Sequence, residues 1–491
     1  MKDMEMDEGS QPGPAKRLSA AQDGRAPPLA GDGQPHSASA RDAADQVRAR
    51  NILGLDGLAA TPALPPRAEH LWRMDRFAAD VPFTNAMFIP VGQITDRGLL
   101  HETVATVVNR HEALRTRLAV RRGRVVQIAE DWKVKHLEIT DVLQSELADV
   151  RPGQTSAVSA FTQGAMDLYA QDGFRCHAFR DEIGDVTLGL LAHGFFADAW
   201  SSQILFREIH AVRDALEKGA SAGLQPAPQY AQYALAQRQS FDGDLSSRLA
   251  YWQGKLKDMP PSRLPYDRDA DVGRRGRSFF FLDQKIVERL AAVAQENRVS
   301  LTILLLAAYQ LSLARWSGQR EILSAAYTAD RVNPRFQNTI GFLVANMPVC
   351  SRIDRNAALK SFLPDFAREY YGSYAHRELS CELYEAIFTP DPPFCASVFN
   401  FIPLRKNFSG GELYSVPSFD GVVTAPDAAK PAIYRDIYLG LSQHPNGILG
   451  KVFYNTGRFS SEATETFIRH FRHVVQTMAT DPDAKLHQLL D

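Results

Sequence analysis

The stretch that decides the fold is LLAHGFFADAWSSQIL, residues 190–205. Its first four residues are the end of a short apolar run, DVTLGLLAH (185–193). This run is bounded by turn residues and is therefore typical of a buried strand. After Asp198, apolar residues recur at helical spacing, starting at Trp200. The sequence thus predicts a strand, a turn that carries His193 and Asp198, and an amphipathic helix.

Composition and charge narrow the class of protein. The chain has 491 residues, of which 45% are hydrophobic and 23% are charged, so it can bury the cores of two or three domains. Because 55 Lys and Arg face 57 Asp and Glu, we expect neither a nucleic acid nor a membrane as a partner. The longest apolar run, residues 301–316, is interrupted by Gln310 and Ser312 and is shorter than the roughly 20 residues of a membrane span. We expect a core helix there, capped by Ser300.

The cysteines and the first residues of the chain indicate the cellular compartment of the protein. The four cysteines have no CxxC spacing, which argues against a metal site or a disulfide framework and suits a reducing cytosol. The first residues are polar and acidic, with no hydrophobic region typical of a signal peptide. We therefore expect a cytoplasmic protein without a metal, whose cysteines are packed in the interior: Cys176, Cys350, Cys381 and Cys395.

Shifts in composition divide the chain into three parts. Residues 1–58 are rich in Gly, Pro, Ala, Asp and Ser and are predicted to be a flexible tail, or else a segment that folds on contact with a partner protein. The rest has two halves of mixed α/β content, which suggests a duplicated layered sandwich. We place the N-terminal lobe at residues 59–240 and the C-terminal lobe at residues 241–491.

Eight motifs in the correct order resemble a known family. From about residue 64 to residue 491 the chain is similar to the condensation domains of nonribosomal peptide synthetases, in the chloramphenicol-acetyltransferase-like superfamily. The motifs are AEHLWRMDRF (68–77), RHEALRT (110–116), AHGFFADAWS (192–201), YAQYALAQRQ (230–239), YWQGKL with LPYDR (251–268), IGFLVANMPV (340–349), HRELSCE (376–382) and FYNTGRFS (453–460).

The resemblance implies a fold and a mode of action. The fold is α/β, with two chloramphenicol-acetyltransferase-like layered sandwich lobes that form a V-shaped pseudo-dimer around a central tunnel. A donor carrier protein, and in some reactions an acceptor carrier protein, docks at a tunnel mouth and delivers a phosphopantetheine arm, so the chain itself binds no cofactor. A single chain completes the tunnel, so we expect a monomer.

The central motif departs from the family pattern. The pattern is His, His, three variable residues, Asp and Gly, whereas this chain has His193, Gly194, three residues, Asp198 and Ala199. The second histidine, which the family uses at the reacting centre, is Gly194. We interpret His193 as a packed core histidine, because successive strand residues face opposite sides of a sheet. The alternative is that Gly194 frees the backbone and brings His193 to the reacting centre.

The resemblance also assigns roles to residues outside His193 and Gly194. Asp198 is expected to pair with Arg331 of the other lobe, the alternative being a solvated helix N-cap. Trp200, Ser201, Phe342 and Asn346 are expected to line the tunnel, although core packing is the favoured interpretation for Trp200. The helix end at Arg110–Glu112 is interpreted as structural.

Three functions follow from these observations. The leading hypothesis is a free-standing condensation enzyme of a nonribosomal peptide or hybrid polyketide pathway, which joins a carrier-bound acyl thioester to a small-molecule amine without the second histidine. Holding reactants together is worth about 7–11 kcal/mol, whereas a general base contributes about a hundred- to ten-thousand-fold in rate. The alternatives are an inactive domain that recruits carrier proteins and tailoring enzymes, and an acyltransferase that uses coenzyme A or a carrier to form an ester with an alcohol.

Overall fold

The computed structural model describes most of the chain: residues 38–55, 63–73, 84–94, 96–121, 124–132, 137–145, 156–163, 166–169, 173–260, 263–270, 273–388, 395–403, 422–431 and 435–491. The chain divides into two compact units, Met1–Ala44 and Asp45–Asp491. In the first unit, the described part is the start of helix α1 (Ala38–Leu53). All described strands lie in the second unit.

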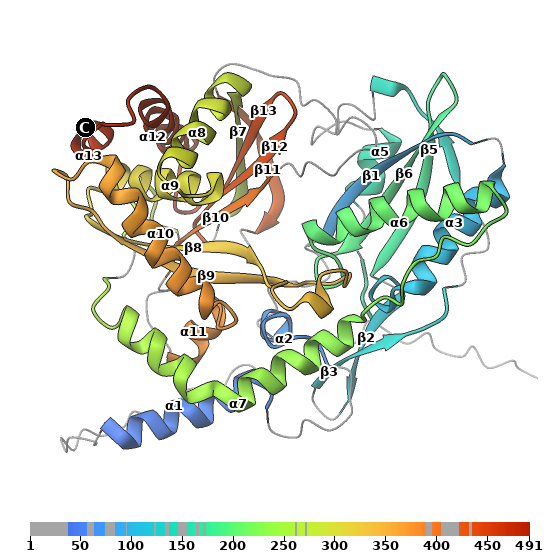
Figure 1. Ribbon diagram of the computed structural model, residues 1–491, viewed down its shortest axis with the longest axis horizontal. Coiled ribbons are helices and arrows are strands. Elements are labelled where there is room, and N and C mark those ends of the chain that lie inside the picture. The colour runs from blue at the N-terminus through green and yellow to red at the C-terminus, as the bar shows by residue number, and fades with distance from the viewer. Residues whose placement is uncertain are drawn as a thin grey trace, which may run out of the picture. The chain divides into compact units, whose positions relative to one another are not determined.

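The sheet nearer the N-terminus has four strands in the order β1-β6-β5-β4, antiparallel except for β4 and β5. Helices α3 (Arg97–Arg110) and α6 (Ala199–Glu217) cover one face (Figure 1), where Val104 of α3 and Ile204 of α6 share a core with Ile89. Helix α5 (Ala157–Gln163) packs in a separate cluster with Phe179. The strands are β1 (Thr84–Gln93), β4 (Ile139–Asp141), β5 (Phe174–Arg180) and β6 (Asp185–His193), and a separate hairpin of β2 (Thr116–Arg121) and β3 (Arg124–Ala129) follows the short helix η1 (Glu112–Arg115).

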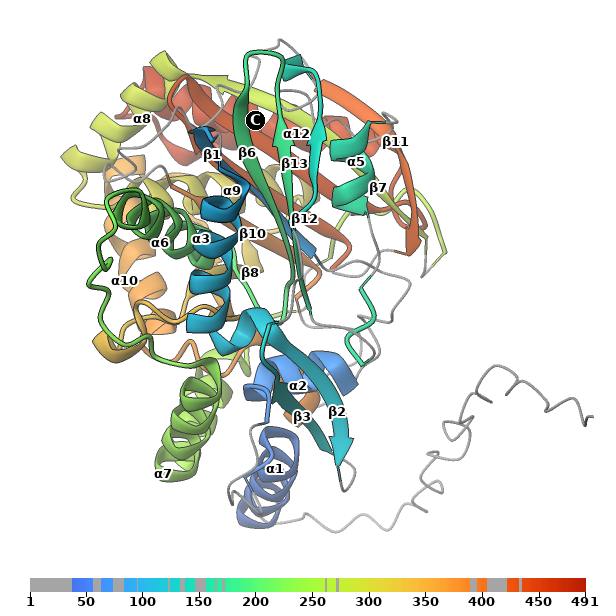
Figure 2. The same ribbon diagram turned by 90° about the vertical axis from the view of Figure 1, so that its right-hand side faces the viewer.

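The second sheet has seven strands in the order β11-β7-β13-β12-β10-β8-β9. Figure 2 shows β7, β13 and β12 of this sheet. Strand β10 runs parallel to β8 and β12, and the other neighbours are antiparallel. Its strands are β7 (Arg274–Asp283), β8 (Glu321–Ala329), β9 (Val344–Arg352), β10 (Ser397–Ile402), β11 (Val422–Pro431), β12 (Ile437–His444) and β13 (Gly447–Asn455). The helices that share its core are α8 (Gln284–Glu296), α9 (Leu301–Ser317), α10 (Leu359–Ala375), α12 (Ser461–Thr480) and α13 (Leu486–Leu490).

Helix α9 is the predicted core helix. It begins after Ser300, whose Oγ accepts a hydrogen bond of 3.2 Å from the Ile303 amide, and it ends at Gly318 in the left-handed conformation (φ 72°). Every residue from Ile303 to Ala314 is buried, which confirms the prediction of a core helix with a serine cap. In the part of the chain that the structure describes, no single helix has the length and hydropathy to span a membrane, and α8 with α9 would do so only across a bend of 102°.

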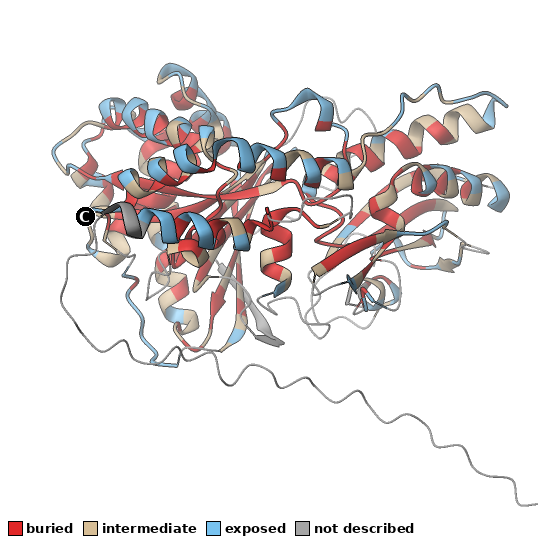
Figure 3. Cartoon of the chain, turned by 90° about the horizontal axis from the view of Figure 1, so that it is seen from below, coloured by how far each residue is buried: buried red, intermediate tan, exposed pale blue. Residues whose placement is uncertain are grey.

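Helix α7 (Tyr230–Leu256) belongs to two cores. Tyr230 and Tyr233 pack with the four-stranded sheet, whereas Phe241 and Trp252 pack with helix α11 (Cys381–Phe388) in a third core. In Figure 3 the buried residues concentrate on the strands and on the inward sides of the helices. The expected lobe boundary between residues 240 and 241 therefore falls inside one helix, four residues before its non-helical position Asp244 (φ −143°).

Two segments differ from the expected division of the chain. The structure has helix α1 over part of the expected tail of residues 1–58, and residues 1–37 lie outside the described residues. Ala49, Leu53 and Leu55 are buried in the core that α7 and α11 share, so a few apolar side chains in a polar segment were enough to fold it. The connection from β8 to β9 packs into the core of the four-stranded sheet with these side chains: Phe336, Ile340, Phe342 and Leu343.

Candidate functional site

The turn between β6 and α6 is fixed by short-range hydrogen bonds. Asp198 is the N-cap of α6, and its Oδ1 accepts from the Ser201 amide at 2.8 Å and from the Ser201 hydroxyl at 2.7 Å. Asn85 of the neighbouring strand β1 donates from Nδ2 to the Ala197 carbonyl at 2.6 Å. The capping residue and the adjacent strand together determine the path of residues 194–198.

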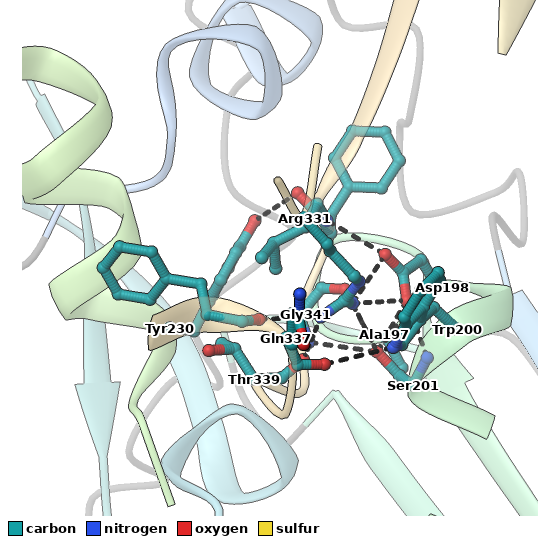
Figure 4. A network of polar contacts seen from close by, with 12 residues as sticks. Ala197, Asp198, Trp200, Ser201, Tyr230, Arg331, Gln337, Thr339 and Gly341 are labelled. Carbon is teal, nitrogen blue, oxygen red and sulfur yellow. Dashed lines mark hydrogen bonds and ion pairs between the residues drawn. The ribbon is translucent and has the colours of Figure 1, made fainter. Parts of the chain in front are cut away.

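The Asp198 carboxylate forms a buried ion pair with Arg331, the partner expected from the sequence (Figure 4). Arg331 Nη2 lies 2.8 Å from Oδ1 and 2.9 Å from Oδ2, and Arg331 Nη1 donates to the Thr339 carbonyl at 2.6 Å. The Leu343 amide also donates to Asp198 Oδ2, at 3.1 Å. Since the two side chains are 3% and 1% exposed, this carboxylate is neither a solvated cap nor a free base.

Gly341 lies where the β8–β9 connection passes closest to this turn. Its carbonyl accepts from the Asp198 amide at 3.2 Å, and its amide donates to Ser201 Oγ at 3.2 Å. A Cβ at Gly341 would lie 2.3 Å from the ring of Tyr230, so a side chain does not fit between α7 and the turn. Trp200 joins the same connection by donating from Nε1 to the Gln337 carbonyl at 3.1 Å.

A cavity of about 680 Å³ adjoins the ion pair and is bounded by residues of both lobes. From the N-terminal half, Asn85 and the start of α6 line it. From the C-terminal half, the lining comes from strands β7, β8, β9, β10, β12 and β13, from the start of α9, from α10 and from the connections after β8 and β10. Of the four residues predicted to line a tunnel, Trp200 and Phe342 line this cavity.

Ser201 and Asn346 were predicted to line the tunnel, but they are buried outside the cavity lining. The Ser201 hydroxyl is used inside the Asp198–Gly341 network, and Asn346 Nδ2 donates to Glu382 Oε1 at 2.8 Å. Both side chains satisfy neighbouring buried groups, which is why neither reaches the cavity.

His193 is a packed core histidine. Its Nδ1 accepts from the Phe195 amide at 3.2 Å, and its ring lies 4.9 Å from the ring of Phe195. Burial lowers the pKa of His193 to about 3, so the ring is neutral at pH 7. His193 is not part of the cavity lining, in agreement with the strand-parity argument.

Gly194 is buried, and its backbone does not use the left-handed region. The alternative of a turn rerouted through a positive φ at Gly194 is therefore not what the structure has. The next residue, Phe195, is buried and meets Phe342 edge-on at 6.5 Å. The backbone angle at Gly194 thus does not require a glycine, and Gly194, like His193, is outside the cavity lining.

A second buried network joins α2 (Pro66–Arg73) to α11. Arg67 donates to Glu382 from Nε (3.2 Å) and Nη2 (3.1 Å), and its guanidinium lies 4.9 Å from the ring of Phe342. Burial alone would raise the pKa of Glu382, but Arg67 and Arg435 hold it well below its usual range. Sequence reasoning missed Arg67, although it directly precedes the first motif, because a single arginine carries no pattern.

Other sequence predictions fall on structural positions. Arg110 Nε and His111 Nε2 lie 2.9 and 2.8 Å from the same oxygen of Glu208, so this motif holds α3 to α6, as expected. His376 stacks on Tyr251 at 3.7 Å and does not line the cavity.

No described group of three or more His, Cys, Asp and Glu side chains is placed to hold a metal ion. All four cysteines are free thiols; Cys176 is half-buried and the others are buried. Cys381 and Cys395 lie with their sulfurs 3.4 Å apart.

Comparisons with known proteins agree with this architecture. The family model described as "Condensation domain" matches residues 83–490. A linear gramicidin synthase of Brevibacillus parabrevis is 26% identical over 442 residues, which are 86% of this chain and 8% of that protein. The phosphinothricin tripeptide synthetase PhsC of Streptomyces viridochromogenes is 26% identical, over 87% of this chain and 41% of that protein. The chain thus spans less than half the length of these relatives.

Solved structures share the fold. The X-domain from teicoplanin biosynthesis has a TM-score of 0.69 at 18% identity and covers 87% of this chain, which in turn covers 97% of it. A complex of that X-domain with OxyB also matches, with a TM-score of 0.68 at 18% identity. SgcC5 from Streptomyces globisporus, in complex with a naphthyl ethanediol, has a TM-score of 0.69 at 20% identity, over 85% of this chain and 99% of its own.

Proposed function

Because this chain belongs to the condensation-domain family, we propose that it is an acyltransferase of a nonribosomal peptide or hybrid polyketide pathway. It joins an acyl thioester, delivered on the phosphopantetheine arm of a carrier protein, to an amine. The observation that carries this proposal is the cavity of about 680 Å³ whose lining comes from both lobes and begins at the Asp198 turn. The peptide synthases among its relatives support the assignment to such a pathway.

The reaction is an aminolysis. The amine nitrogen forms a bond to the thioester carbonyl carbon, the carbon–sulfur bond breaks, and the proton of the amine ends on the released thiol or in solvent. Neither His193, which is neutral and buried in the core, nor Asp198, which is paired with Arg331, is available to accept that proton. The chain therefore acts by holding the two reactants at reacting distance, which can be worth about 7–11 kcal/mol.

An amine suits this site better than an alcohol. An amine with some free base at neutral pH attacks without help, whereas an alcohol needs its proton removed as it attacks. The same chemistry argues against the ester-forming alternative with coenzyme A or a carrier.

A second function is favoured by the missing base itself. Gly194 supplies no side chain, Ala199 stands where the central motif has Gly, and Ala345 stands where the motif that IGFLVANMPV resembles has Asn. The teicoplanin X-domain shares the fold and forms a complex with OxyB, so a non-catalytic domain that recruits a tailoring enzyme is the alternative.

One experiment separates these functions. The full chain is mixed with an acyl-loaded carrier protein and either an amine or an alcohol of the same skeleton, and product is measured against the uncatalysed rate. Wild type is expected to form amide and little ester. Gly194→His is expected to raise ester formation by about a hundredfold or more, with a smaller gain for amide.

A control variant and a change of acyl donor complete this experiment. Gly243→His, in helix α7 where an added Cβ meets nothing within 4 Å, is expected to behave as wild type. Absence of product from both wild type and Gly194→His, with folding intact by circular dichroism, would support the recruiting function instead. Replacing the carrier thioester by the coenzyme A thioester tests the coenzyme A form of the third function, which predicts undiminished formation of the ester.

A further inference from the structure

The wall of the cavity is unusually aromatic. Nine of its 23 described lining residues are Phe, Tyr or Trp, against 10% in the whole chain. Three belong to one floor on the seven-stranded sheet, namely Tyr327 of β8, Tyr438 of β12 and Phe453 of β13. Three more, Tyr370, Tyr371 and Tyr374, come from α10. An enrichment of this size calls for an explanation in terms of what the cavity holds.

Strand alternation places the floor on the face opposite the core that α8 and α9 share with this sheet, and Tyr327 and Tyr438 also pack against the third core. Ile437 and Leu439, on either side of Tyr438, belong to the hydrophobic core of this sheet, and so do Val452 and Tyr454, on either side of Phe453. Because successive strand residues face opposite sides, Tyr438 and Phe453 face the cavity.

The floor rings are ordered relative to one another. Tyr438 and Phe453 are register partners on β12 and β13, and their rings are 5.6 Å apart and 20° from parallel. Tyr327 lies 6.0 Å from Tyr438 at 57°. Asn400 of β10 donates from Nδ2 to the Tyr438 hydroxyl at 2.9 Å, which fixes that ring in its plane. The three rings of the floor therefore have defined positions relative to one another.

The described lining offers little charge to a ligand. Its only carboxylate is Asp198, which is held by Arg331, and its only cation is Arg275, which lies 5.8 Å from the ring of Phe453. A substrate group that carries an ammonium would find no available carboxylate among these residues. Aromatic rings, in contrast, prefer offset-stacked or edge-to-face partners at 4.5–7 Å.

We propose that the floor of Tyr327, Tyr438 and Phe453 binds a planar, uncharged aryl group of one of the two substrates. This inference rests on the proposed function for its statement that the aryl group belongs to a substrate. The binding itself requires no turnover. Tyr438 is the specificity-determining residue, because it contacts both neighbouring rings and is held by Asn400.

The test measures binding before catalysis. Two short thioesters of N-acetylcysteamine are titrated into the full chain by calorimetry, one with a 3-phenylpropionyl group and one with a 3-cyclohexylpropionyl group of the same carbon skeleton. The phenyl thioester is expected to bind about two- to tenfold more tightly, the range that an aromatic pair contributes beyond area burial. Equal binding of the two thioesters, or no binding of either, would overturn the inference.

Variants localise the preference. Tyr438→Leu and Phe453→Leu are expected to remove the preference for the phenyl thioester. Tyr438→Phe retains the aromatic ring and is expected to retain this preference. Tyr266→Leu, at an aromatic residue outside the cavity lining, is the matched control and is expected to leave the preference unchanged. A preference that survives in Tyr438→Leu would show that the ring binds elsewhere and would overturn the assignment.

Failure of this inference and failure of the proposed function are distinguishable. A phenyl preference in binding without any amide product would contradict the condensation function and leave the aryl site standing. Amide formed equally well from carrier-bound phenylpropionyl and cyclohexylpropionyl groups, with equal binding of the two thioesters, would overturn the aryl site and leave the condensation function standing.

Discussion

Asp198 and Arg331 lie 133 positions apart in the chain, yet one guanidinium nitrogen of Arg331 lies 2.8 and 2.9 Å from the two oxygens of the Asp198 carboxylate. The pair ties the first turn of α6 to the connection that leaves β8. Asp198 lines the cavity, and its carboxylate also accepts from the amide of Leu343, the neighbour of the lining residue Phe342, so this carboxylate joins two walls of the cavity.

Removal of one partner of this ion pair is predicted to lower the free energy of unfolding more than removal of both partners. Arg331→Met leaves a buried, uncompensated carboxylate and should lower the free energy of unfolding by about 3–5 kcal/mol. The double variant Asp198→Asn/Arg331→Met should lose clearly less, because no charge is left unpaired and the amide oxygen can still accept from the Ser201 amide. Urea unfolding of the two variants and wild type measures both effects. Arg335→Met, at an exposed arginine of the same connection, is the control, and a single-variant loss within its range would contradict the prediction.

Gly341 is predicted to be intolerant of a side chain. The Cβ of Gly341→Ala would lie 2.3 Å from the Tyr230 ring, and overpacking of this kind costs about 1–3 kcal/mol. Tyr230→Leu should relieve the clash, so the double variant should be more stable than the sum of the single changes implies. Thermal and urea unfolding test this. Gly254→Ala, where an added Cβ meets nothing within 4 Å, should be neutral or slightly stabilising, and an equal loss there would refute the steric explanation.

The local elements of the site could be predicted from the sequence, because their patterns are strong. The apolar run at 185–193 and the helical spacing after Asp198 predict a strand and a helix, and the structure has both elements. Strand parity was sufficient to place His193 in the core. The partner of Asp198 came instead from family resemblance, since a separation of 133 residues leaves no local signal.

The cavity could not be predicted residue by residue. Ser201 and Asn346 were expected in the lining on motif position alone, but each is closer to a buried polar group that it satisfies. Asn85 was missed because an asparagine in a strand belongs to no motif, and only the pairing of β1 with β6 brings it to the turn. The aromatic floor was missed because its members come from three strands that are separated in the chain.

His193 is predicted to make stability depend on pH. Its pKa in the folded chain is about 3, whereas an unfolded histidine titrates near about 6.5. Between these pH values the unfolded chain binds a proton at His193 that the folded chain does not bind. The free energy of unfolding should therefore fall as the pH drops from about 6.5 towards 3, by up to about 1.4 kcal/mol per pH unit. His193→Gln, which keeps an acceptor for the Phe195 amide, should lack this contribution.

Urea unfolding of wild type and His193→Gln at pH 7.0, 6.0 and 5.0 gives the comparison. The difference in unfolding free energy between the two proteins should change towards acid pH in favour of the variant. His473→Gln, at an exposed position of α12, controls for the substitution. Parallel pH profiles for wild type and His193→Gln would show that His193 takes up a proton in the folded state.

Glu382 is predicted to support both the fold and the cavity wall. It accepts two hydrogen bonds from Arg67, whose guanidinium lies 4.9 Å from Phe342 and 5.3 Å from Tyr327, and both of these rings line the cavity. Glu382→Gln removes the charge that compensates the buried Arg67, so we expect a loss of about 3–5 kcal/mol in the free energy of unfolding. The difference in unfolding free energy between wild type and Glu382→Gln should shrink in acid. It should fall as the pH drops below about 4.3, the ordinary pKa of a glutamate, towards the lowered pKa of Glu382.

The matched control is Glu369→Gln, which breaks the more exposed ion pair with Lys255 and should cost less than about 1 kcal/mol. Because Arg67 is released next to Phe342 and Tyr327, Glu382→Gln should also weaken the binding of the phenylpropionyl thioester in the fraction that remains folded, whereas Glu369→Gln should not. Calorimetry below the unfolding transition measures this. Equal thioester affinity in Glu382→Gln and wild type would mean that the Arg67 network supports the fold without positioning the cavity wall.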